Sequence, residues 1–175
     1  IEVTIACGLP KGDKLEWIVQ KGTELGCNQF IGFPAKTSVV KWDHKKRAAK
    51  EKRLQKIATE AAEQSHRQQT PSVSLVEKTQ EIIAQFDSYD TVLVAYEESA
   101  KQGEKSQLAQ VLSTCQPGAR LCVLFGPEGG FAPQEIEQFL QTGAKLCGLG
   151  PRILRAETAP LYLLSAVSYQ MELLN

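Results

Sequence analysis

The chain has 175 residues, 42% hydrophobic and 23% charged, so it is long enough for one globular domain with a full core. Its 20 basic and 20 acidic residues cancel, which excludes nucleic-acid binding through the charge of the whole domain and leaves only local patches for that role. The sequence contains no apolar run near the roughly 20 residues of a membrane span and no signal peptide in residues 1–12, so we expect no membrane segment.

The five cysteines are irregularly spaced and form no C-x-x-C pair. Cys122 and Cys147 fall in apolar, strand-like stretches, where a reduced thiol behaves as a small hydrophobic side chain. We therefore expect free structural thiols and a cytoplasmic protein, because disulfides are rare in reducing compartments. No metal site is expected, since neither His44 nor His66 pairs with a cysteine at the spacing of zinc ligands.

The first quarter of the chain combines two strand patterns with one helix. Asp13, followed by Glu16 three residues later, resembles a capping box at the start of that helix. Gly26 is expected to end it, because glycine readily adopts the left-handed backbone found after a helix. The strands are predicted at residues 1–6 and 28–33, and residues 37–42 form either a short strand or an ordered loop.

A long helix is predicted for residues 43–67, with Asp43 as its N-cap. One face of this helix is apolar and contains small residues, which favours close packing against a neighbour. Another face gathers polar side chains at helical spacing, including Glu63, Gln64 and Arg67. These three are candidate site residues, or else a solvated face with a Glu63–Arg67 ion pair.

A run of basic residues begins just before this helix and covers its first half. It either contacts RNA phosphates or forms a solvated helix face, and the sequence does not decide between the two. The run comprises Lys41, Lys45, Lys46, Arg47, Lys50, Lys52, Arg53 and Lys56.

The second half of the chain continues the alternation of strands and helices. Such alternation predicts an α/β fold with a largely parallel sheet, and no linker or repeat divides the chain. Strands are expected at 73–77, 91–97, 121–125 and 144–149, a polar loop at 101–106, and helices at 80–86, 107–112, 133–141 and 160–174.

The last helix is apolar on nearly every side, and Glu172 is its single charged residue. A helix of this kind has to be covered on more than one face. The cover is either a second copy of the chain, which makes a homodimer, or other elements of the same monomer.

Two turns rich in glycine and proline each follow an apolar strand. Residues 126–130 read GPEGG, and residues 149–152 read LGPR. Neither turn is a Walker-type phosphate loop or a G-x-G-x-x-G fingerprint. On its own, the first turn fits a simple tight turn before a helix that starts at Pro133. Because a second such turn follows, with Arg152, Arg155 and Glu157 close behind, we interpret the two as binding a ligand together.

Four segments together carry a family resemblance: KGDKLEWIVQKGTELG, EAAEQSHR, GPEGGFAPQEIE and LGPRILRAETA. In these segments, the chain resembles the SPOUT superfamily of RNA methyltransferases. More specifically, it resembles the family that methylates N3 of a uridine in small-subunit (16S) ribosomal RNA. The resemblance covers essentially the whole chain. The sequence, which starts on Ile1, does not contain the N-terminal PUA-like RNA-binding domain of that family. Residues 1–175 are therefore interpreted as the SPOUT domain of a longer protein.

The resemblance implies a C-terminal trefoil knot, a homodimer with its site near the interface, and S-adenosylmethionine in the knotted cleft. It assigns the cofactor walls to the end of one strand and to the two turns. The implied cofactor-binding residues are Ala95, Glu97, Leu124, Gly126, Pro127, Glu128, Gly129, Gly130, Leu149, Gly150, Arg152, Ile153 and Leu154.

The chemistry of uracil N3 suggests roles for the polar residues. N3 carries a proton and attacks poorly until that proton leaves, so the site should offer a base or donors that stabilise the uracil anion. Arg155 is the candidate donor, and Arg152 the candidate for contact with the cofactor or a phosphate. Both arginines could instead pair with Glu157 or Glu128. Glu63 or Glu157 could be the base, and no spacing selects one.

Two further readings remain open at this point: a SPOUT enzyme that acts on transfer RNA, and a non-catalytic module for RNA binding or ribosome assembly. The pairing of EAAEQSHR with GPEGGF favours the ribosomal family. Thr37 departs from that family's pattern, which often has arginine there, so no substrate contact is assigned to it. We expect residues 1–175 to bind cofactor but to methylate weakly without an RNA-binding domain.

Overall fold

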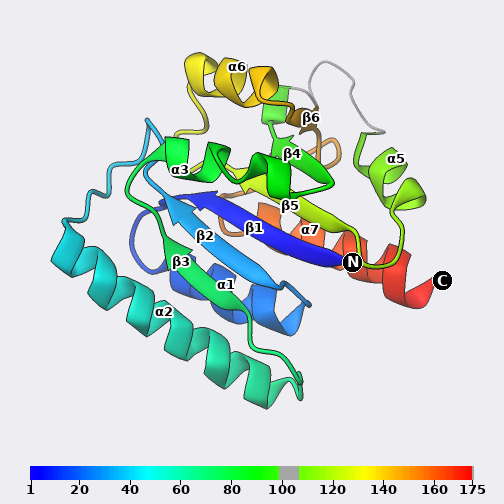
Figure 1. The fold of residues 1–175 in the computed structure, drawn as a ribbon, viewed down its shortest axis with the longest axis horizontal. Coiled ribbons are helices and arrows are strands. Elements are labelled where there is room, and N and C mark those ends of the chain that lie inside the picture. The colour runs from blue at the N-terminus through cyan, green and yellow to red at the C-terminus, as the bar shows by residue number, and fades with distance from the viewer. Residues whose placement is uncertain (99–106, 175) are drawn as a thin grey trace.

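The computed structural model describes residues 1–98 and 107–174, and its centre is a six-stranded parallel sheet (Figure 1). The strand order is β3-β2-β1-β5-β4-β6, and the carboxyl ends of the strands therefore share one edge. This confirms the predicted α/β fold with a mostly parallel sheet. The strands are β1 (Glu2–Gly8), β2 (Gln29–Phe33), β3 (Ser72–Leu75), β4 (Thr91–Ala95), β5 (Arg120–Phe125) and β6 (Lys145–Cys147).

Helices cover both faces of the sheet, which explains why its central strands are apolar without alternation. In β5, for example, Val123 packs into the core under one face and Leu124 into the core under the other. The first face is covered by α1 (Lys14–Glu24), α2 (His44–Gln64), α5 (Gln107–Thr114) and α7 (Ala159–Ser168). The second is covered by α3 (Thr79–Ile83), the 3₁₀ turn η1 (Phe86–Ser88) and α6 (Pro133–Gln141).

Some element boundaries differ from the predictions. Strand β4 ends at Ala95, because Glu97 begins a helical turn, and β6 stops at Cys147. Residues 37–42 form an ordered loop, so the loop alternative holds and the strand alternative is wrong. The loop predicted at 101–106 lies outside the described residues. Helix α1 ends at Glu24, and Gly26 follows with a backbone φ of +95°, as expected for the glycine that terminates this helix.

The N-cap of α2 is as predicted, but that of α1 is not. The Asp43 carboxylate accepts a hydrogen bond from the backbone N–H of Lys46 at 2.7 Å. Asp13 makes no side-chain cap bond, and its φ of −100° and ψ of 13° lie outside the extended region that an N-cap needs. Glu16 accepts a hydrogen bond from Arg53 Nε on α2 at 2.5 Å. The predicted capping box at Asp13 is therefore wrong.

These two aspartates form a matched pair for a stability test. The substitution Asp43→Ala is expected to lower the free energy of unfolding by about 1 kcal/mol, because it leaves one amide of the first turn unsatisfied. The control Asp13→Ala removes no cap bond and is expected to change the free energy of unfolding by less than about 0.5 kcal/mol. Urea denaturation followed by circular dichroism measures both, and equal losses would contradict the assignment.

The last helix covers the sheet with only one of its faces. Pro160, Leu163, Leu164 and Val167 are buried, and the α-helix passes into a π-helical turn, η2 (Tyr169–Leu173). Several large apolar side chains on the other face are exposed. They are Tyr162 (40%), Tyr169 (57%), Leu173 (72%) and Leu174 (56%).

The cysteines are free thiols, as predicted, and four of them are buried. Burial raises the pKa of Cys27 to about 12, so it stays protonated and packs as an apolar side chain.

No helix in the described part of the chain is long and apolar enough to cross a membrane. In residues 1–98 and 107–174, no group of three or more His, Cys, Asp or Glu side chains is placed to hold a metal ion.

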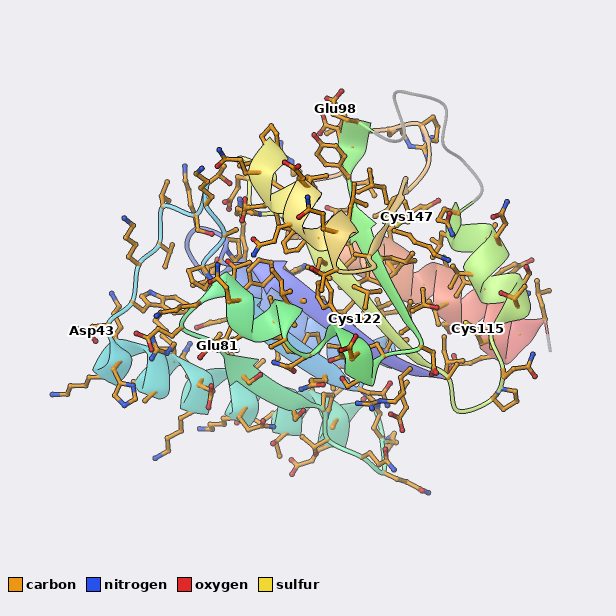
Figure 2. All side chains as sticks on the ribbon, turned by 45° about the horizontal axis from the view of Figure 1, so that its top comes forward. Asp43, Glu81, Glu98, Cys115, Cys122 and Cys147 are labelled. Carbon is orange, nitrogen blue, oxygen red and sulfur yellow. The ribbon has the colours of Figure 1, made fainter. Side chains whose placement is uncertain are left out.

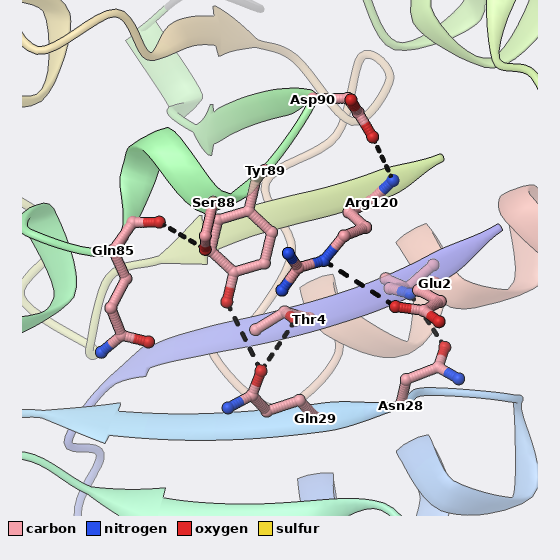
Figure 3. A network of polar contacts seen from close by, with 10 residues as sticks. Glu2, Thr4, Asn28, Gln29, Gln85, Ser88, Tyr89, Asp90 and Arg120 are labelled. Atoms are coloured by element: carbon pink, nitrogen blue, oxygen red, sulfur yellow. Dashed lines mark hydrogen bonds and ion pairs between the residues drawn. The ribbon is translucent and has the colours of Figure 1, made fainter. Parts of the chain in front are cut away.

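A polar network ties together the amino-terminal part of the sheet (Figure 3). Thr4 Oγ1 and Tyr89 Oη contact Gln29 Oε1 at 3.4 and 3.5 Å. The Arg120 guanidinium lies 5.4 Å from the Tyr89 ring centroid, and its Nε is 3.8 Å from Glu2 Oε2. Burial raises the pKa of Tyr89. These side chains partner one another, whereas the ligand-sized cleft described next lies at the opposite, carboxyl-terminal edge.

Candidate functional site

A cleft of about 820 Å³ lies at the carboxyl edge of the sheet, at the ends of β4, β5 and β6. Its walls are residues 95–98, the turn at 126–130 and the loop at 149–154, followed by residues up to 159. Figure 2 labels Glu98, which follows β4 and lies on this wall. The edge where parallel strands end is where open α/β sheets bind ligands. The two glycine-proline turns therefore line one cleft, as the sequence predicted.

The 126–130 turn is folded so tightly that Gly126 has no room for a side chain. A Cβ there would lie 3.0 Å from the Gly130 carbonyl carbon and 3.1 Å from the Phe131 nitrogen. The turn closes with a 2.8 Å hydrogen bond from the Gly130 N–H to the Pro127 carbonyl, and Gly130 has a φ of +70°. Both glycines are required, and they leave the backbone beside the cleft bare of side chains.

The 149–154 loop leads directly into α7. The Arg155 carbonyl accepts hydrogen bonds from the N–H groups of Thr158 and Ala159 at 2.9 and 3.0 Å, which fixes the start of the helix. Arg155 and Glu157 consequently lie on the wall of the cleft. Among the described residues, neither Arg152 nor Arg155 forms an ion pair. The alternative in which these arginines pair with Glu128 or Glu157 is therefore wrong.

Lys14, at the start of α1, joins the two walls of the cleft. Its Nζ lies 2.9 Å from Glu128 Oε1 and 3.9 Å from Glu157 Oε2. The backbone N–H of Lys11 donates to the same Glu128 oxygen at 2.8 Å. Desolvation opposes the charge on Glu128, but the hydrogen bonds from Lys14 and Lys11 outweigh it and lower the pKa of Glu128. The hydrogen bond to Glu128 raises the pKa of Lys14. We call this arrangement the Lys14 bridge.

The second Glu157 oxygen, Oε2, is buried and has no hydrogen-bond partner among the described residues. At 3.9 Å, Lys14 Nζ is too far to donate a hydrogen bond to it, although close enough to stabilise its negative charge. A buried carboxylate oxygen without a donor is costly. The wall of the cleft therefore carries a carboxylate with one buried oxygen that no described residue satisfies.

Most of the predicted cofactor residues line the cleft, and one does not. Leu124 is fully buried in the core, because its side chain points to the face of the sheet covered by α6. Its assignment to the cofactor wall is wrong. The other predicted residues all line the cleft: Ala95, Glu97, Gly126, Pro127, Glu128, Gly129, Gly130, Leu149, Gly150, Arg152, Ile153 and Leu154.

The structure does not bring Glu63, Gln64 and Arg67 to this cleft. They lie at the far end of α2, where Glu63 and Gln64 are exposed. Arg67 Nη1 donates to the carbonyls of Thr23 and Cys27 at 3.0 and 2.6 Å, so it fastens the segment after α2 to the end of α1 and to the turn between α1 and β2. The Glu63–Arg67 ion pair suggested for a solvated face is also absent among the described residues.

Sequence reasoning missed several residues of the wall. Lys14 stood in a segment that carried the family resemblance, but nothing local indicated that it reaches Glu128. Phe131 is buried at the base of the cleft, stacked 6.2 Å from Phe33 and edge-on to Phe139 at 5.2 Å. The other missed residues are Glu98, Phe125, Ala156 and Ala159.

Comparison with known proteins supplies a family. A family model described as an RNA methyltransferase domain matches residues 1–168. A Bacillus subtilis protein named ribosomal RNA small subunit methyltransferase E is 55% identical over 175 residues, which are 100% of this chain and 68% of that protein.

Two solved structures add the fold. The ribosomal RNA small subunit methyltransferase E of Neisseria gonorrhoeae, bound to S-adenosyl methionine, has a TM-score of 0.81 and 29% identity. The alignment covers 96% of this chain and 65% of that one. A putative methyltransferase of Legionella pneumophila with the bound cofactor SAM has a TM-score of 0.85 and 27% identity, covering 96% and 66%. The chain thus spans about two thirds of the length of these proteins.

Proposed function

The chain belongs to the RNA methyltransferase family of the SPOUT superfamily, and we propose that it transfers the methyl group of S-adenosylmethionine to N3 of a uridine in small-subunit (16S) ribosomal RNA. The family rests on the match over residues 1–168 and on the 55% identity to the Bacillus protein. Small-subunit ribosomal RNA is inferred from the names of the relatives, and uridine N3 from the resemblance that the sequence motifs carry. The observation that carries the proposal is the cleft between the 126–130 turn and the 149–154 loop.

The cleft fits S-adenosylmethionine in size and chemistry. Its volume of about 820 Å³ lies within the range of small-molecule pockets. Gly126 and Gly130 keep the wall free of side chains, so a ligand can reach backbone N–H and C=O groups directly. Phe125 and Phe131 supply apolar surface. The bound cofactor would provide a methyl group that its sulfonium already activates, so the protein has mainly to align the acceptor nitrogen.

Arg155 and Glu157 are the groups we assign to the uracil. The Glu157 carboxylate, which lies on the wall of the cleft, accepts the N3 proton, and the electron pair left on N3 becomes the nucleophile. As negative charge develops on the neighbouring carbonyl oxygens, Arg155 donates hydrogen bonds to them. N3 lies on the Watson–Crick edge, so the target uridine is unpaired when it binds. Arg152, exposed on the same wall, contacts the cofactor or a phosphate.

Between the two candidate bases, the geometry favours Glu157. Glu157 lines the cleft and has an unsatisfied oxygen, whereas Glu63 is exposed at the far end of α2. A general base has to be within hydrogen-bond reach of the proton that it removes. Of these two glutamates, Glu157 is the one that lies on the wall of the cleft within one chain.

We also propose a homodimer, a trefoil knot and a cytoplasmic location. The exposed apolar side chains of α7 and η2, together with Trp17 (52%) and Ile153 (69%), form surface that a second copy could cover. Ile153 also lines the cleft, so such an interface would lie beside the site.

The 126–130 turn and the 149–154 loop line the same cleft, and this arrangement fits a knot formed by the segment after residue 149. Free thiols fit a reducing compartment. We take residues 1–175 as the SPOUT domain.

The Lys14 bridge gives a testable prediction for cofactor binding. Lys14→Met is expected to weaken S-adenosylmethionine binding about two- to fivefold, the effect that one partly exposed ion pair supports. The control Lys11→Met should bind normally, because only the backbone N–H of Lys11 contacts Glu128. Isothermal titration calorimetry measures both dissociation constants, and equal binding by the two variants would contradict a role for the bridge.

The bridge also predicts a pH dependence. The pKa of Glu128 is lowered in the folded protein, so the contribution of its charge is present above the ordinary carboxyl pKa and is lost as the pH falls through the lowered value. The difference in cofactor affinity between wild type and Glu128→Gln should therefore stay constant from neutral pH down to the ordinary carboxyl pKa, and disappear only at a pH below that pKa. A difference that persisted in acid would show that charge is not its origin.

The proposed function is tested by binding and by mapping. Calorimetry of the folded protein with S-adenosylmethionine should show saturable binding. Its absence would instead favour the non-catalytic RNA-binding or assembly module. Nucleoside mapping of ribosomal RNA from a strain lacking the protein should then show that N3-methyluridine is missing from the small subunit. If it persisted while a transfer RNA lost a methyl group, the transfer RNA alternative would replace the ribosomal one.

A further inference from the structure

We propose that the amino-terminal half of α2 and the loop before it form a binding track for single-stranded RNA phosphates, which leads the strand to the cleft. The track consists of Lys41, Lys45, Lys46 and Lys50 and is called the basic track below. This inference rests on the proposed function, since it names where that substrate is held. It addresses the basic run whose role the sequence leaves open.

The charges of the basic track are not held in ion pairs, although Lys50 acts on Glu16 from a longer distance and helps to lower the pKa of that carboxyl. Lys41, Lys45, Lys46 and Lys50 form no ion pair in the part of the chain that the structure describes. Three other basic residues of the same run are paired, whereas Lys52, farther along α2, forms no ion pair among the described residues. Arg47 lies 3.8 Å from Glu77, Arg53 lies 2.5 Å from Glu16, and Lys56 lies 3.7 Å from Glu60.

The position of these lysines on the helix is unfavourable for α2 itself. The first turn of a helix carries partial positive charge, so acidic residues stabilise it and basic residues destabilise it. The first turn of α2 contains no acidic residue and begins with His44, Lys45 and Lys46. Only the Asp43 cap, just before the helix, counters their charge. This end of α2 therefore concentrates unneutralised positive charge that helix stability does not explain.

The loop between β2 and α2 connects the track to the rim of the cleft. Thr37 Oγ1 donates to the Gly130 carbonyl at 2.5 Å, and a Cβ on Gly129 would lie 2.9 Å from the Thr37 Cβ. The backbone N–H of Lys36 donates to the buried Glu135 at 3.0 Å. The loop is thus fastened to the 126–130 turn at one end and runs to α2 at the other (Figure 1).

The outer end of the loop is also held in place. Trp42 packs against the core, and Lys50 Nζ lies 5.6 Å from its ring centroid. Between the two anchors, Val39 is 65% exposed. Figure 2 shows nitrogen-tipped side chains extending into solvent around Asp43 at the start of α2. An RNA strand with its target base in the cleft would pass over a fixed loop and then meet the lysines.

RNA phosphate is the occupant that this chemistry selects. Lysine ammonium groups on flexible stems contact phosphates without reading sequence. The formal net charge of the chain is zero, so a polyanion gains attraction only at a local concentration of positive charge such as this one. The loop that leads into the track contacts the 126–130 turn on the rim of the cleft in which the proposed substrate base reacts, and that connection favours RNA over an acidic protein partner.

The test compares two double variants on one helix. Lys45→Ala with Lys46→Ala removes two charges from the track, and Lys52→Ala with Lys56→Ala removes two charges roughly 10–16 Å farther along α2. Binding of a short single-stranded RNA is measured by fluorescence anisotropy over a range of salt concentrations. Methylation of small subunits that lack the modification gives KM and kcat, and calorimetry with S-adenosylmethionine checks that both variants fold.

The track variant should bind RNA about fivefold more weakly, and the slope of log affinity against log salt should fall by about 1.4, as loss of two phosphate contacts on a single strand implies. Its KM should rise, while kcat and cofactor affinity stay unchanged. The control variant should match wild type in all of these. Equal weakening by both variants, or an unchanged salt slope in the track variant, would overturn the proposal. If the wild-type protein itself failed to bind S-adenosylmethionine, that result would contradict the proposed function and not the basic track alone.

Discussion

Replacing Arg155 with alanine should lower kcat for methyl transfer about 10²–10³-fold, the effect of removing one donor from a developing oxyanion. Arg155 lines the cleft and forms no ion pair among the described residues, so its guanidinium is available to a substrate. Affinity for S-adenosylmethionine should change little, because the uracil and not the cofactor receives its hydrogen bonds. Single-turnover kinetics with excess enzyme measure the rate, and calorimetry measures the affinity.

Arg152→Ala is the matched control for this prediction. It removes the same kind of side chain from the same wall, but we assign Arg152 to cofactor or phosphate contact. Its effect should therefore appear in the dissociation constant of the cofactor or in KM for RNA, with kcat nearly unchanged. If the two variants exchanged these signatures, the roles of the two arginines would have to be exchanged as well.

The substitution Glu157→Ala should lower kcat about 10²–10⁴-fold, the contribution of a positioned general base. Added formate should restore part of the rate in this variant, because a small carboxylate can occupy the vacated space beside Lys14. A purely structural role for Glu157 would not respond to formate. The rate is measured with methyl-labelled cofactor and small subunits that lack the modification.

Two other carboxylates serve as controls for Glu157. Glu63→Gln should leave kcat unchanged, since Glu63 is exposed at the end of α2 remote from the cleft. Glu128→Gln should weaken cofactor binding through loss of the Lys14 bridge, with kcat largely kept. A strong loss of kcat in Glu63→Gln, together with normal turnover in Glu157→Ala, would identify Glu63 as the base, contributed by a second copy of the chain.

Local patterns were sufficient to predict the sheet and the two turns. The apolar runs that became β1, β2 and β5 are each bounded by turn residues, so their direction and burial could be anticipated. The turns at 126–130 and 149–154 stood out because glycine and proline are adjacent there. Parallel strands place their ends at one edge, so a common ligand site for the two turns followed from topology.

The errors arose where a side chain has a distant partner or where burial depends on the face of the sheet. Glu16 looked like the second member of a capping box, but its carboxylate binds Arg53 on α2. Leu124 lies on a strand beside the cleft, but its alternation places it in the core. The bond from Lys14 to Glu128 joins residues 114 positions apart, and no local signal encodes such a contact.

Glu63, Gln64 and Arg67 illustrate a different limit. Glu63 and Gln64 form an exposed polar end of the helix as predicted, but α2 ends at Gln64 and Arg67 lies beyond it. No pattern within the helix could tell which edge of the sheet this polar end would reach. The direction in which α2 runs along the sheet decides which edge its polar end reaches. The helix begins beside the carboxyl edge of the sheet and ends at the opposite edge (Figure 1). The basic start of α2 is therefore close to the cleft, and the polar cluster at its end is remote from it.

The most direct test of the proposed function is to identify the methylated nucleoside. The protein is incubated with methyl-labelled S-adenosylmethionine and small ribosomal subunits from a strain that lacks the modification. The ribosomal RNA is then digested and its nucleosides are separated by mass spectrometry. The proposal predicts label in N3-methyluridine, at a rate that Arg155→Ala and Glu157→Ala each lower about 10²-fold or more. Label in a ribose or in another base, or N3-methyluridine formed equally well by both variants, would contradict it.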